Sequence, residues 1–136
     1  MADQRHARWL IDTSVVIDLA LIEPADLPLE LAVSAMTMAE LAAGPHATAD
    51  PAERARRQDR LQRVEATFAP LPVDAAVARA YGRVYAAGGT AGRTARGRRA
   101  VDLYIAATAV AAGLPLYTRN PDDFAGLSEI LEVVAV

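Results

Sequence analysis

Six acidic or amide side chains in this sequence lie at the end of apolar segments or within one. They are Asp12, Glu40, Asp102, Asn120, Asp122 and Asp123. Carboxylates within ~4 Å of one another repel by roughly 4 kcal/mol at an effective dielectric constant of 20, so they need a cation or shared protons. Oxygen ligands without histidine or cysteine suit magnesium or manganese, and such an ion can activate water and neutralise charge on a phosphate. Whether these side chains form one site depends on the elements that carry them.

The spacing of the apolar residues predicts those elements. Apolar runs predict strands at residues 9–11, 31–36, 114–118 and 130–136. Helical spacing between capping residues, glycines and prolines predicts helices at residues 15–22, 38–43, 51–68, 75–87 and 100–112. The alternation of strands and helices predicts an α/β fold. We expect one three-layer α/β/α domain over residues 1–136, with a mostly parallel central sheet and a polar leader at residues 1–7.

The predicted fold collects most of these side chains at one edge of the sheet. Asp12, Glu40 and residues 120–123 each follow a strand, and in open α/β folds ligands bind where parallel strands end. Each also has an ordinary structural alternative: Asp12 as a helix N-cap, Glu40 in a capping box with Thr37, and residues 120–123 as a turn. Asp102 falls in the first turn of its predicted helix, where the dipole favours a carboxylate. Burial of that apolar helix would still demand a charged or metal partner.

The composition argues against several classes of site and protein. The chain has no cysteine, and its two histidines, His6 and His46, lie in the polar leader and in a Gly-Pro loop. Thiolate chemistry, a histidine metal cluster and a Ser-His-Asp triad are therefore disfavoured. A hydrophobic content of 53% and a net charge of −3 indicate a globular domain that is not uniformly basic. No apolar run approaches the ~20 residues of a membrane span, and residues 1–8 lack the apolar core of a signal peptide, which predicts a cytoplasmic protein.

Several short motifs occur in an order typical of a known family. Asp12-Thr13-Ser14 follows an apolar strand, and Glu40 lies in a Met-Ala-Glu-Leu helix start. Asp102 begins an Asp-x-x-Ile-Ala-Ala-x-Ala segment, and residues 118–124 read Thr-Arg-Asn-x-x-Asp-Phe. This ordered set resembles the PIN domain, in particular the VapC toxins of bacterial toxin–antitoxin pairs, over residues 8–134. The resemblance implies a magnesium-dependent endoribonuclease that inhibits translation, is held inactive by a small cognate VapB-like antitoxin, and commonly forms a homodimer.

The resemblance also assigns roles to the first three acidic positions. Asp12 and Asp102 would ligate the metal, which is Mg²⁺ or alternatively Mn²⁺. Glu40 would complete the catalytic site, either as a ligand or by orienting the attacking water. Thr13 or Ser14 would hydrogen-bond a carboxylate or a bound water, and a plain capping role is the equal alternative for both.

The fourth acidic position departs from the pattern of many family members. Where some carry an aspartate, this chain has Asn120, a weaker and neutral oxygen ligand. The missing charge can come from Asp122 or Asp123, and we favour Asp123 as the fourth catalytic carboxylate.

Arginine supplies all 14 basic residues, and none is lysine. Four arginines lie in the Gly-rich loop just before the helix predicted at residues 100–112: Arg93, Arg96, Arg98 and Arg99. An acidic metal pocket repels RNA, so these side chains could contact phosphates beside it, with a flexible loop in an arginine-rich protein as the equal alternative. In the helix at residues 51–68 the arginines interleave with acids, which favours a solvated face over an RNA surface.

Other families that place acids at a sheet edge fit less well. A phosphoaspartate hydrolase of the haloacid dehalogenase type would need a second aspartate where Ser14 stands, and both it and a response-regulator receiver would need a lysine, which the chain lacks. Two broader alternatives stay open. The chain could be a PIN-type nuclease outside any toxin pair, or a non-catalytic α/β interaction module whose acids are only caps and surface charges.

Overall fold

The central element of the computed structural model, which describes residues 8–89 and 97–136, is a parallel sheet of four strands. In spatial order β2-β1-β3-β4 they are Glu30–Ala32, Arg8–Ile11, Leu116–Thr118 and Val133–Ala135. Every pairing between neighbouring strands is parallel, with Leu10 opposite Ala32 on one side and Leu116 on the other. All four strands therefore end at the same edge, which confirms the predicted parallel sheet and its common carboxyl edge.

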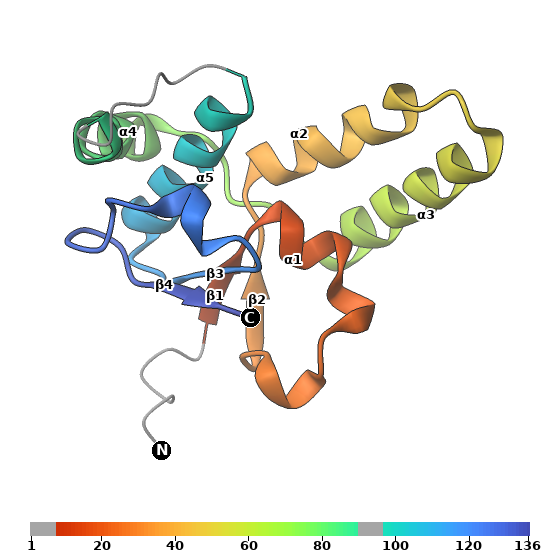
Figure 1. The fold of residues 1–136 in the computed structure, drawn as a ribbon, viewed down its shortest axis with the longest axis horizontal. Helices are drawn as coiled ribbons and strands as arrows, with labels where there is room; N and C mark the ends of the chain where they lie inside the picture. The colour runs from red at the N-terminus through yellow and green to blue at the C-terminus, as the bar shows by residue number, and fades with distance from the viewer. Residues whose placement is uncertain (1–7, 90–96) are drawn as a thin grey trace.

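Helices cover both faces of this sheet, so the three-layer α/β/α architecture predicted from the sequence is confirmed (Figure 1). The helices are α1 (Thr13–Ile17), α2 (Ala35–Ala43), α3 (Pro51–Thr67), α4 (Ala75–Gly89) and α5 (Arg98–Ala112). Leu10 and Leu116 point to one face and pack with α4 and α5. Ile11 and Tyr117, the next residues along the same strands, point to the other face and pack with α1, α2 and α3.

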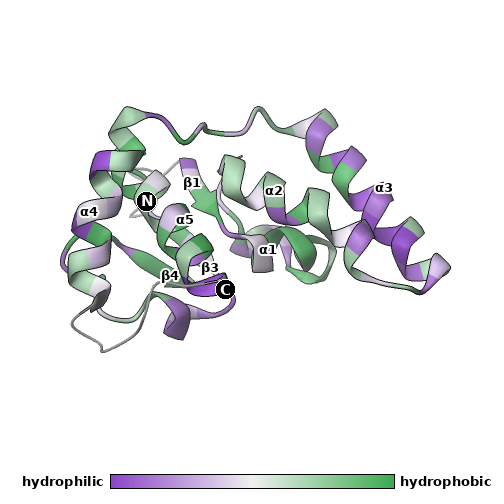
Figure 2. Ribbon diagram, turned by 90° about the horizontal axis from the view of Figure 1, so that it is seen from above, coloured by the Kyte–Doolittle hydropathy of each residue, from purple (hydrophilic) through white to green (hydrophobic). Residues whose placement is uncertain are grey.

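Helices α2 and α3 form an antiparallel pair that extends away from the sheet (Figures 1 and 2). A short 3-10 turn, Gly44–Ala47, joins them, and Asp50 caps the start of α3 by accepting a hydrogen bond from the Glu53 amide at 3.2 Å. Only Val64 of α3 is buried, while most of the helix is hydrophilic, as Figure 2 shows in purple. The predicted solvated face of this helix is therefore present.

The structure corrects several element boundaries. The helix predicted at residues 15–22 is shorter: α1 ends at Ile17, and a 3-10 turn at Leu19–Leu21 follows. The strand predicted at residues 31–36 ends at Ala32, because the side chain of Ser34 accepts a hydrogen bond from the Thr37 amide at 3.0 Å and starts α2 there. Helix α5 begins at Arg98, two residues before the predicted start.

The C-terminal strands are also shorter than predicted. β3 covers three residues of the predicted 114–118, and β4 covers three residues of the predicted 130–136. Leu131 of the predicted last strand is buried but lies in the irregular segment that precedes β4. The polar leader at residues 1–7 lies outside the described residues. In the part of the chain that the structure describes, no helix has both the length and the apolar character needed to cross a membrane.

Candidate active site at the carboxyl edge of the sheet

Asp12 follows the last residue of β1 and is 6% exposed. Its Oδ1 accepts hydrogen bonds from the Val15 amide at 3.1 Å and from the Ser14 hydroxyl at 2.5 Å. Its Oδ2 accepts a hydrogen bond from the Thr118 hydroxyl at 2.5 Å. Asp12 is thus the N-cap of α1, which was the structural role predicted as its alternative. It also lies at the sheet edge where a ligand would bind. The two roles are compatible, because Oδ2 accepts one hydrogen bond and keeps a second lone pair for a ligand.

Thr118 is a site residue that the sequence reasoning missed. It is fully buried at the end of β3, and its hydroxyl donates to Asp12 while accepting from the Asn120 amide at 3.0 Å. It therefore fixes the Asp12 carboxylate and the start of the following turn at the same time. A polar residue closing an apolar strand just before Asn120 was the signal that could have identified it.

Glu40 lies one turn before the end of α2, and its Oε1 accepts a hydrogen bond from the Thr13 hydroxyl. Thr13 also lies 3.1 Å from the hydroxyl of Thr37, which is fully buried. The capping box predicted for Thr37 and Glu40 is wrong, because Ser34 is the cap and Thr37 is already the third residue of the helix. The Glu40 carboxylate therefore faces α1 and Thr13 rather than the start of its own helix.

Asp102 lies on α5, partly buried, and interacts electrostatically with the other acids of the site. The pKa of Asp102 is raised from 3.8 to about 6, chiefly by burial and further by the negative charges of Asp123, Glu40 and Asp12, while Arg98 opposes the increase. Helix α5 begins earlier than predicted and has no acidic residue in its first turn, so the expected dipole stabilisation of Asp102 at that position is wrong. What the structure brings together is four carboxylates at one sheet edge, on four different elements.

The turn after β3 separates the three candidates for the fourth acidic position. Asn120 and Asp122 are exposed, whereas Asp123 is partly buried and is the neighbouring charge with the largest effect on Asp102. The guanidinium of Arg99 donates a hydrogen bond to the backbone carbonyl of Asp123, which ties the start of α5 to this turn. Among the three, Asp123 is the one placed to act with Asp102.

The four loop arginines proposed as RNA contacts divide into two groups. Arg93 and Arg96 lie outside the described residues. Arg98 and Arg99 belong to the first turn of α5 rather than to the loop, because α5 starts at Arg98. Arg98 is exposed and close enough to Asp102 to lower its pKa, while Arg99 is engaged with Asp123 as described above.

The donor set fits a hard cation that keeps much of its hydration shell. Within the described residues the Asp102 carboxylate accepts no hydrogen bond, although it is partly buried among three other acids. Among the same residues it forms no ion pair, and the nearby charge of Arg98 only partly offsets the effects of burial and of the three acids. No three acidic or histidine side chains in residues 8–89 and 97–136 form a ready-made ligand cluster, so an ion here would be held by few carboxylates and otherwise by water, as Mg²⁺ commonly is.

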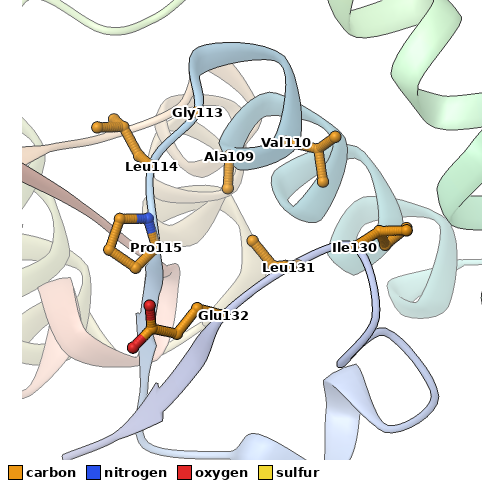
Figure 3. A pocket seen from close by; sticks show the side chains of 8 residues that line it. All are labelled: Ala109, Val110, Gly113, Leu114, Pro115, Ile130, Leu131 and Glu132. Carbon is orange, nitrogen blue, oxygen red and sulfur yellow. The ribbon is translucent and has the colours of Figure 1, made fainter.

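A hollow lies at the opposite, amino-terminal end of β3, and none of the candidate site residues lines it. It has a volume of about 230 Å³ and lies between the end of α5 and the segment leading into β4 (Figure 3). Its lining is mostly apolar, with Glu132 as the one acid. The chemistry of the molecule is therefore concentrated at the carboxyl edge.

Comparison with known proteins agrees with this geometry. A family model described as PIN domain matches residues 9–129. The chain belongs to the PIN-domain family. This PIN-domain protein is 37% identical over 124 residues to Ribonuclease VapC5 of Mycobacterium tuberculosis, which covers 89% of this chain and 88% of that relative. The predicted resemblance to the family is thus confirmed.

Two solved structures share the fold of this PIN domain. The crystal structure of VapBC-5 from Mycobacterium tuberculosis, a member of the VapBC family of toxin–antitoxin systems, matches with a TM-score of 0.82 and 37% identity, covering 96% of this chain and 99% of that one. The crystal structure of FitAcB from Neisseria gonorrhoeae matches with a TM-score of 0.69 and 28% identity, covering 92% and 95%.

Proposed function

We propose that this protein is a divalent-metal-dependent endoribonuclease and the toxin of a type II, VapBC-like toxin–antitoxin pair. The observation that carries the proposal is the placement of Asp102 near Asp123, Glu40 and Asp12 at the carboxyl edge of a parallel sheet, where burial first and these negative charges second raise the pKa of Asp102 to about 6. The PIN-domain family and the similarity to a protein named a ribonuclease support an RNA substrate. Cleavage of RNA would inhibit translation.

The proposed catalytic residues are Asp12, Glu40, Asp102 and Asp123. Asp12, which follows β1, and Asp102, on α5, would hold the ion, Mg²⁺ or alternatively Mn²⁺. When bound, such an ion neutralises charge on the phosphate and lowers the pKa of a bound water. Glu40 orients the attacking water, and the hydrogen bond from the Thr13 hydroxyl fixes which carboxylate oxygen remains available for it.

The surrounding side chains position these groups. Ser14 and Thr118 hold the Asp12 carboxylate in one orientation. Asn120 and Asp122 are auxiliary residues at the exposed side of the turn, and Asp123 supplies the fourth charge. Because the edge is acidic, RNA needs compensating cations nearby, and the proposed phosphate contacts are Arg93, Arg96, Arg98 and Arg99.

The proposed partners are RNA as the substrate and a small cognate antitoxin as the inhibitor. VapBC-5 from Mycobacterium tuberculosis is described as a member of a family of toxin–antitoxin systems, which supports this assignment. We further propose a homodimer, and the cytoplasm as the compartment because translated RNA is found there. A PIN nuclease outside any pair is the alternative, and a short reading frame directly upstream that encodes a DNA-binding antitoxin would favour the toxin.

The test is cleavage of total RNA by the purified protein, freed of any bound partner. The wild type is compared in Mg²⁺, in Mn²⁺ and in EDTA, and the variant Asp102→Asn is compared in Mg²⁺. Discrete fragments from the wild type with either metal, and none in EDTA or from the variant, are the expected result. No cleavage together with no Mg²⁺ binding by calorimetry would favour a non-catalytic interaction module.

A further inference from the structure

A pocket of about 340 Å³ opens beside the carboxylate cluster and shares Glu40 with it. Thr13, which hydrogen-bonds Glu40, also lines it, together with residues of α3 and of the start of α5. Three arginines line it: Arg57, Arg60 and Arg98. A volume of this size lies at the lower end of the range for small-ligand pockets, which suits about one nucleotide unit.

We call this hollow the arginine pocket, and its acidic side chains do not neutralise all three of its arginines. Arg57 is held by two hydrogen bonds, from Nε to Glu53 at 2.8 Å and from Nη1 to the Gly44 carbonyl at 2.9 Å. Glu53 is also bound by Arg56 at 2.8 Å, and these two arginines hold the pKa of Glu53 below its usual value. The charge of Glu53 is therefore balanced by its two ion pairs. Arg57 connects α3 to the end of α2 through the Gly44 carbonyl.

Arg60 and Arg98 remain available on two sides of the pocket. Within residues 8–89 and 97–136, neither side chain makes a hydrogen bond or an ion pair. Arg60 is partly buried on α3, and Arg98 is exposed on α5, close enough to Asp102 to affect its pKa. Two arginine side chains without partners, next to an acidic edge, would bind an anion that extends to that edge.

We propose that the arginine pocket binds a backbone phosphate of the RNA strand next to the scissile bond, with Arg60 and Arg98 as its contacts. This inference rests on the proposed nuclease function and adds α3 to the substrate path. An acidic segment of a protein partner could use the same charges. RNA is favoured because Glu40 lines the pocket and belongs to the carboxylate cluster, so a ligand in the pocket is continuous with the one at the cluster.

The test measures RNA binding in an Asp102→Asn background, which prevents cleavage and also removes the charge that Arg98 affects. A fluorescent single-stranded 12-nucleotide RNA is titrated with Arg60→Gln, Arg98→Gln and the matched control Arg63→Gln at several salt concentrations. Arg63 is exposed on the same helix and does not line the pocket. Each pocket variant should weaken binding about 5- to 10-fold and reduce the slope of log K against log salt by about 0.7, whereas the control should change neither.

Each other outcome contradicts a different step. If wild-type protein cleaves RNA but the pocket variants bind like Arg63→Gln, the pocket proposal is refuted and the nuclease stands. If wild-type protein neither binds nor cleaves RNA, the proposed function itself fails. If Arg60→Gln leaves RNA binding unchanged and reduces co-purification of the cognate antitoxin, the pocket belongs to the protein partner. Unchanged thermal midpoints for all variants will establish that the fold is intact.

Discussion

The carboxylate of Asp102 should destabilise the metal-free protein at neutral pH, and Asp102→Asn should remove this cost. The pKa of Asp102 rises from 3.8 to about 6 on folding, because burial and neighbouring acids disfavour its charged form. The folded protein therefore binds this proton more tightly than the unfolded chain does. Stability from this group is fully present below pH 3.8, decreases as the pH rises toward 6, and is lost above it.

The size of this effect follows from the two pKa values. Their difference corresponds to about 3 kcal/mol in the free energy of unfolding for a group that is fully shielded from solvent. Asp102 is only partly buried, so solvent screening reduces the expected effect to about 1–1.5 kcal/mol. For a domain of 136 residues this equals a rise of about 3–6 °C in the thermal midpoint of Asp102→Asn above pH 7.

The assay is urea unfolding in EDTA from pH 4 to pH 8, followed by circular dichroism. Asp102→Asn should match the wild type near pH 4 and exceed it increasingly up to about pH 7. Asp122→Asn is the matched control, because Asp122 is exposed and is not among the charges that raise the pKa of Asp102. A variant that is less stable than the wild type above pH 7, or a difference that does not change with pH, would refute the reasoning.

Three further predictions concern the ion, a helix cap and the hydroxyl that holds Asp12. Millimolar Mg²⁺ should raise the thermal midpoint of the wild type more at pH 8 than at pH 5, where Asp102 is mostly protonated. Scanning calorimetry measures the midpoint, and an equal rise at both pH values would argue against this prediction. Ser34→Ala should cost about 1 kcal/mol in urea unfolding because α2 loses its N-cap, and an unchanged midpoint would mean that another group caps the helix. Thr118→Val should lower the free energy of unfolding by about 1–3 kcal/mol and reduce RNA cleavage. Thr118→Ser keeps the hydroxyl bonded to Asp12 and should retain both stability and cleavage, so equal losses in the two variants would favour packing over the hydrogen bond.

The part of the fold that the sequence predicted depends on local signals. An apolar run that ends in Asp12 and resumes with helical spacing specifies a strand, a turn and a helix within ten residues. Asp50 followed by proline specified the start of α3 in the same way. Because a parallel sheet gathers its carboxyl ends at one edge, these local assignments were sufficient to predict that Asp12, Glu40 and the turn after β3 share that edge, whereas the position of Asp102 depends on how α5 packs.

What the sequence did not predict depends on contacts between distant segments. The hydrogen bond from Thr118 joins residues 106 positions apart, and no local pattern marks a buried threonine as a carboxylate donor. Thr37 had the right spacing to Glu40 for a capping box, but Ser34, three residues earlier, competes for the same helix start. The arginine pocket likewise depends on α3 folding back along α2, which the mixed charge of α3 does not reveal.

The two proposed metal ligands differ in how the protein prepares them. Asp12 is buried and accepts hydrogen bonds from two hydroxyls and one amide, so its position is fixed before any ion arrives. Asp102 accepts none within the described residues and has three acids and one arginine as its charged neighbours. In the proposed site Asp12 would therefore set where an ion binds, whereas Asp102 would release a proton on binding it at pH values below its pKa of about 6. It follows that mutations around Asp12 should mainly change the geometry of the site, while those around Asp102 should mainly change the pH at which the ion binds.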